Sequence, residues 1–75
     1  MDKRILIAFH AFKERVKGLH DDGYRVMWQS DAPSAMLHAK LVHHNGNRIS
    51  IFAYPDENKL VQLTNHIKVY DGRLF

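Results

Sequence analysis

The chain has 75 residues, of which 25% are charged and 45% hydrophobic, and its formal net charge is +3. This composition and length predict a single folded domain over residues 1–75 and exclude a disordered chain. No apolar run in the sequence approaches the roughly 20 residues that a membrane-spanning helix needs. Cysteine is absent, which excludes disulfides and thiolate zinc sites and makes the cytoplasm the expected location.

Residues 2–21 are predicted to form one helix. Asp2 is suited to cap its N-terminus, and Gly23 is suited to end it in a left-handed conformation. One stripe at helical spacing is apolar and suited to a core, namely Ile5, Phe9, Phe12, Val16 and Leu19. A second stripe is basic and is interpreted as a solvated face rather than a phosphate-binding ridge: Lys3, His10, Lys13, Lys17 and His20.

The next segment, Tyr24 to Gln29, alternates in polarity and predicts a strand. In a regular strand, Tyr24, Val26 and Trp28 share one side. Residues 30–34 contain proline and short polar residues, so we expect a loop there.

Two apolar-rich runs then meet at His44-Asn45-Gly46, which predicts a β-hairpin. A two-residue loop would place the apolar residues of the two strands on opposite faces of the sheet. A three-residue loop pairs Leu41 with Ile49 and collects the apolar residues on one face. We therefore predict the three-residue loop, with a left-handed Gly46 and an inner face made of Leu37, Ala39, Leu41, Ile49, Ile51 and Ala53.

The C-terminal third allows two interpretations. After a turn at 55–58, the β-branched residues favour a fourth strand at 59–64. The alternative is a helix over 57–70, where apolar residues also fit helical spacing, giving an αβββα order as in a double-stranded-RNA-binding domain. Asp71-Gly72 predicts a further turn. We predict an α+β fold, with an N-terminal helix packed on a three- to four-stranded antiparallel β-meander.

The sequence carries no recognisable catalytic or metal-binding signature. Its six histidines show no HxxxH or HExxH spacing, and the adjacent His43 and His44 would point to opposite faces of a strand. The serines, threonines and paired carboxylates lie in no nucleophile–base context. We therefore predict a non-enzymatic protein with no metal and no cofactor.

The outer face of the predicted sheet is the one constellation with a clear chemistry. Aromatic rings stack on nucleic-acid bases, and cations bind the phosphates. The predicted contact residues are Arg25, His38, Lys40, Arg48, Phe52 and Tyr54. The sequence thus favours a binding module for single-stranded nucleic acid. The alternative is a protein-binding regulator or a homodimer that buries the same face.

Overall fold

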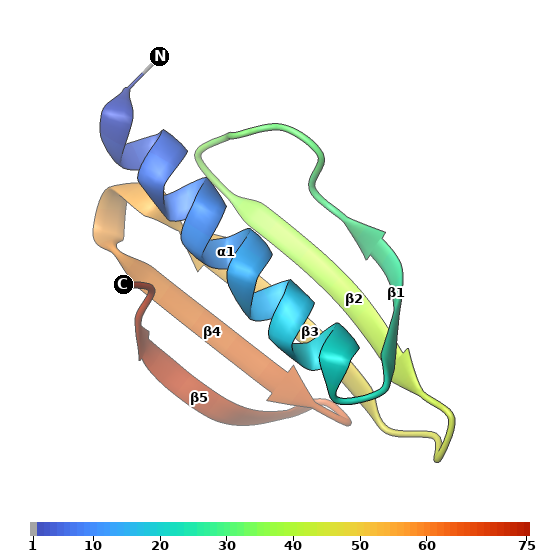
Figure 1. Ribbon diagram of the computed structural model, residues 1–75. Coiled ribbons are helices and arrows are strands. Elements are labelled where there is room, and N and C mark those ends of the chain that lie inside the picture. Colours follow the sequence, from blue (N-terminus) through green and yellow to red (C-terminus); the bar gives the residue numbers. More distant parts are fainter. Residues whose placement is uncertain (1) are drawn as a thin grey trace.

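The computed structural model describes residues 2–75 and shows one helix packed on a five-stranded antiparallel sheet (Figure 1). Its elements are α1 (Lys3–Asp21), β1 (Tyr24–Gln29), β2 (Leu37–His43), β3 (Arg48–Tyr54), the 3-10 helix η1 (Pro55–Glu57), β4 (Lys59–Thr64) and β5 (Ile67–Arg73). The strands lie side by side in chain order, so the sheet is a meander. The predicted α+β fold is confirmed, with five strands where the sequence predicted three to four.

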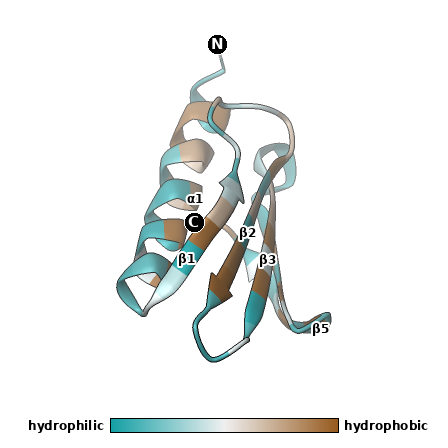
Figure 2. Ribbon diagram, turned by 90° about the vertical axis from the view of Figure 1, so that its right-hand side faces the viewer, coloured by the Kyte–Doolittle hydropathy of each residue, from teal (hydrophilic) through white to brown (hydrophobic). Residues whose placement is uncertain are grey.

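The helix α1 lies across one face of the sheet (Figures 1 and 2). Its N-terminus is capped as predicted, because the Asp2 carboxylate accepts a hydrogen bond of 2.9 Å from the backbone N–H of Arg4. Ala8, Phe12 and Val16 are buried against the sheet. No helix within residues 2–75 combines the length and the apolar character that a membrane crossing requires.

The β2–β3 hairpin has the predicted three-residue loop. The backbone N–H of His43 donates to the carbonyl of Asn47 at 2.8 Å, and Gly46 has a φ of +97°. Leu41 lies opposite Ile49. All six predicted inner-face residues are therefore buried, and they form the core together with Phe12, Val16 and Leu60.

The first strand differs from its prediction, because a β-bulge interrupts its pairing with β2. Val26 lies opposite Leu41, but Trp28 lies opposite Lys40, so Met27 is an extra residue. Trp28 therefore shares the face of Lys40 and not the face of Val26. The predicted grouping of Tyr24, Val26 and Trp28 on one side was wrong for Trp28.

The C-terminal third is a second hairpin, so the helical alternative for residues 57–70 was wrong. Asn65 and His66 form the turn between β4 and β5 with φ angles of +52° and +69°, as in a type I′ turn. Asp71 and Gly72 lie inside β5, opposite β4, so the turn predicted there does not form. A second bulge interrupts the β4–β5 pairing next to Leu63.

Candidate functional site

The sheet has one face that no helix covers. α1 packs on the inner face, and the opposite face is free of helix within residues 2–75 (Figure 2). The strand pairing and the lining of the surface hollows assign the side chains of this outer face: Arg25, Met27, Trp28, His38, Lys40, Val42, Arg48, Ser50, Phe52, Tyr54, Lys59, Val61, Leu63, Lys68, Asp71 and Arg73. All six predicted contact residues are on this face.

The outer face holds most of the positive charge of the chain. It carries six of the 11 lysines and arginines but one of the eight carboxylates, so its formal charge is +5 and the remaining residues carry −2. The single carboxylate, Asp71, lies 3.2 Å from the Lys68 ammonium and 3.9 Å from that of Lys59. The other four cations have no carboxylate partner among the described residues, namely Arg25, Lys40, Arg48 and Arg73. Such a surface attracts anions.

Three rings lie next to one another across β1, β2 and β3, and we call them the aromatic strip: Trp28, His38 and Phe52. The rings of His38 and Phe52 are stacked, with centroids 4.3 Å apart and planes 11° apart. The Trp28 ring follows at 5.5 Å from His38. Trp28 is 53% exposed, whereas Phe52 is half-buried beneath its neighbours. The exposed ring of the strip is therefore Trp28.

The surroundings of His38 favour its neutral form. Burial lowers its pKa below the ordinary value of 6.5, and the nearby charge of Lys40 lowers this pKa further. Its Nε2 is buried and has no hydrogen-bond partner in the described part of the chain. A neutral imidazole in this place stacks on Phe52, lies tilted against Trp28, and adds no charge to the face.

The structure brings some predicted residues together and separates others. His38 and Phe52 stack, and Lys40 lies beside them with Trp28 around one shallow hollow. Arg25 lies further along β1, near His43 and His44. Tyr54 is half-buried at the C-terminal end of β3, opposite Lys59 of β4.

Sequence reasoning missed Trp28 as a surface residue. The regular alternation from Tyr24 to Gln29 assigned it to the inner face, and β1 contains no glycine or proline that marks a bulge. The adjacent apolar pair Met27-Trp28 does not mark the bulge either, because the regularly paired strands β2 and β3 also contain such pairs, Leu41-Val42 and Ile51-Phe52.

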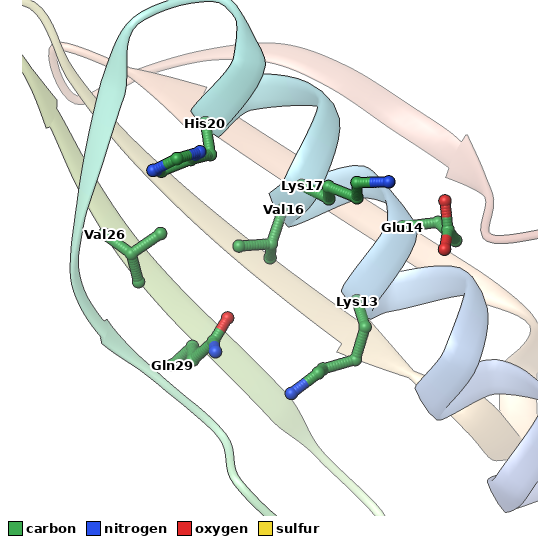
Figure 3. A pocket seen from close by; sticks show the side chains of 7 residues that line it. All are labelled: Lys13, Glu14, Val16, Lys17, His20, Val26 and Gln29. Atoms are coloured by element: carbon green, nitrogen blue, oxygen red, sulfur yellow. The ribbon is translucent and has the colours of Figure 1, made fainter.

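A second hollow lies on the other side of the sheet, between α1 and β1 (Figure 3). Val16 and Val26 face each other across it, and Lys13 and His20 point towards β1 (Figure 3). The charges here are partly balanced, because Glu14 lines the hollow together with Lys13 and Lys17. The basic stripe predicted on the helix is exposed at this edge, without the excess of charge that distinguishes the outer face.

Within residues 2–75, no group of three or more potential ligands is placed to hold a metal ion. In comparisons with known proteins, no family model, no curated protein and no solved structure matches the chain. A functional assignment therefore depends on the chemistry of the outer face.

Proposed function

We propose that the chain is a small, non-enzymatic binding module whose outer face contacts single-stranded nucleic acid. The observation that supports this proposal is the aromatic strip within a face of formal charge +5. Stacking of a base on an aromatic side chain contributes about 1–3 kcal/mol, and lysine and arginine bind the phosphates. In the absence of cysteine, the cytoplasm is the compartment that we propose.

The arrangement of the face suits an extended chain that crosses the strands. Val61 lies opposite Phe52 and extends the aromatic strip with an apolar side chain on β4. Strands are about 4.8 Å apart, so the strip from β1 to β4 spans roughly 14 Å. Unpaired cations flank it on both sides, with Arg48 at one end of β3 and Arg73 beyond the other. Phosphates on either side of a stacked base therefore find a positive charge.

The same face predicts weak discrimination between sequences. It carries no asparagine or glutamine, and these are the amides that read adenine edges. Stacking accepts any base, because every base has a π-face. We therefore propose binding that tolerates different sequences and depends strongly on salt.

An amide-shift titration with short single-stranded oligonucleotides at low salt tests the proposal. We expect shifts on the outer face and not on α1, and a steep loss of affinity with added salt. Phe52→Ala and Arg48→Ala should weaken binding, whereas Lys17→Ala on the helix is the control that removes one charge elsewhere. If no oligonucleotide binds at low salt, or if Lys17→Ala has the same effect as Arg48→Ala, the proposal is wrong.

The alternative, a protein-binding regulator or homodimer, is supported by a different observation. Met27, Trp28 and Met36 are 59%, 53% and 49% exposed near one edge of the sheet. Methionine and tryptophan are enriched at protein interfaces. Sedimentation at several concentrations tests self-association. A dimer that Tyr54→Ala weakens, together with no response to oligonucleotides, would support this alternative and exclude nucleic-acid binding.

A further inference from the structure

We propose that a hollow beside the aromatic strip binds one phosphate group, so that the outer face holds a nucleotide unit in a fixed orientation. This inference deepens the proposed function and rests on it. The hollow has a volume of about 140 Å³ and lies between β2, β3 and the β4–β5 turn. The side chains that define its chemistry are those of Met27, Lys40, Arg48, Ser50 and His66.

Two uncompensated cations border the hollow. Lys40 lies opposite Ser50, and Arg48 is two residues from Ser50 on the same strand, so the two cations are diagonal neighbours on one face. Side chains in such positions are about 7–8 Å apart at their origins. No carboxylate lines the hollow or pairs with either cation among residues 2–75. The two positive charges repel each other, and an anion bound between them removes this repulsion.

The turn that carries His66 is fastened to Arg48. The backbone N–H of Asn65 donates to the carbonyl of Arg48 at 2.8 Å, and the N–H of Arg48 donates to Asn65 Oδ1 at 3.0 Å. The Asn65 amide also donates to Asn47 Oδ1 at 3.1 Å. The backbone of the turn is therefore fixed at the rim of the hollow before any ligand arrives. The turn itself then needs no ordering on binding, and this favours affinity.

The phosphate hollow adjoins the place where a base would stack. Lys40 also borders, with Trp28 and His38, the neighbouring shallow hollow on the aromatic strip. A base on Trp28 therefore has its phosphate within reach of Lys40 and, beyond it, of Arg48. The ligand chemistry is a phosphate ester next to a stacking base. A free phosphate, a mononucleotide and a single strand all share the phosphate part.

Amide-shift titrations with four probes separate these sources: uridine, inorganic phosphate, uridine monophosphate and an oligouridylate of eight residues. We expect uridine to shift the Trp28 indole signal and inorganic phosphate to shift the signals of Arg48, Ser50 and His66. Uridine monophosphate should shift both sets. It should also bind more tightly than either part, because the two contacts are made by one molecule.

Arg48→Gln and His66→Asn test the hollow itself, and asparagine is chosen because it tolerates the left-handed conformation of residue 66. Loss of a charge-assisted hydrogen bond should weaken phosphate binding about tenfold in Arg48→Gln. Lys17→Gln, which removes the same charge from α1, should change it less than twofold. The response of Trp28 to uridine should persist in all three variants.

The outcomes distinguish this inference from the proposed function. If the oligouridylate binds on the outer face but phosphate does not shift the signals of Arg48, Ser50 and His66, the inference that the hollow binds phosphate is wrong and the proposed function stands. The inference is also wrong if phosphate shifts the signals of all lysines and arginines equally, or if Lys17→Gln weakens phosphate binding as much as Arg48→Gln does. If phosphate binds in the hollow but no oligonucleotide binds, the nucleic-acid function is wrong and a small-anion site remains.

Discussion

Replacing Trp28 with alanine should weaken oligonucleotide binding by about 5- to 150-fold. This range follows from about 1–3 kcal/mol for one base stacked on an aromatic ring, at tenfold in affinity per 1.4 kcal/mol. Because Trp28 is 53% exposed, about half of its roughly 200 Å² is covered, and truncation costs at most about 2.5 kcal/mol of unfolding free energy. The domain should therefore stay folded while it loses affinity.

The matched control is Phe75→Ala. Phe75 is 52% exposed and follows β5, at the edge of the sheet opposite to Trp28. It should lose a similar amount of stability and no affinity. Urea denaturation followed by circular dichroism measures the stability, and the anisotropy of a labelled oligonucleotide measures the affinity. If both variants keep the affinity of the unmodified protein, the aromatic strip does not stack on bases and the reasoning is refuted.

Four further predictions concern stability, and urea denaturation measures each of them. His38 has a lowered pKa in the folded state, so the folded protein binds fewer protons than the unfolded one; the unfolding free energy should fall as the pH decreases through 6.5, and His38→Phe should show a smaller fall. If the unfolding free energy of His38→Phe falls with pH as steeply as that of the unmodified protein, His38 is not the cause of the fall. Gly46→Ala should cost about 1–2 kcal/mol for its φ of +97° alone, since no atom lies within 4 Å of the added Cβ. Gly23→Ala, with a φ of +100°, should cost more than Gly46→Ala, because its Cβ would lie 2.9 Å from His43 Nε2. In a protein that also carries His43→Ala, the costs of the two glycine substitutions should become equal. Leu41→Ala should cost about 2–5 kcal/mol, because this side chain is 1% exposed in the core; a loss below 1 kcal/mol would show that the site collapses around the smaller residue.

The central hairpin was predictable because two independent signals agree on it. Asn45-Gly46 marks the turn, and the burial of Leu41 and Ile49 on one face allows a single loop length. A shift of one residue would have turned Ile49, Ile51 and Ala53 of β3 away from the core. The outer face of β2 and β3, and therefore most of the candidate site, follows from this register.

The two edge strands were less predictable, for local reasons. The bulge at Met27 leaves no mark in the residue types of β1, so tertiary packing decides which way Trp28 points. In β5, the Asp71-Gly72 pair resembles a turn, but Asp71 stays in the strand, where it pairs with Lys68. The real turn is Asn65-His66, where both residues have a positive φ and the glycine that usually marks such a turn is absent.

The two bulges also affect how copies of the chain meet. They interrupt the pairing of β1 and of β5, the outermost strands of the sheet. An irregular, strongly twisted border is a poor template for another strand, and natural proteins use it to prevent aggregation through their sheet edges. The domain should therefore remain dispersed at high concentration, and any self-association should occur face to face rather than by continuing the sheet.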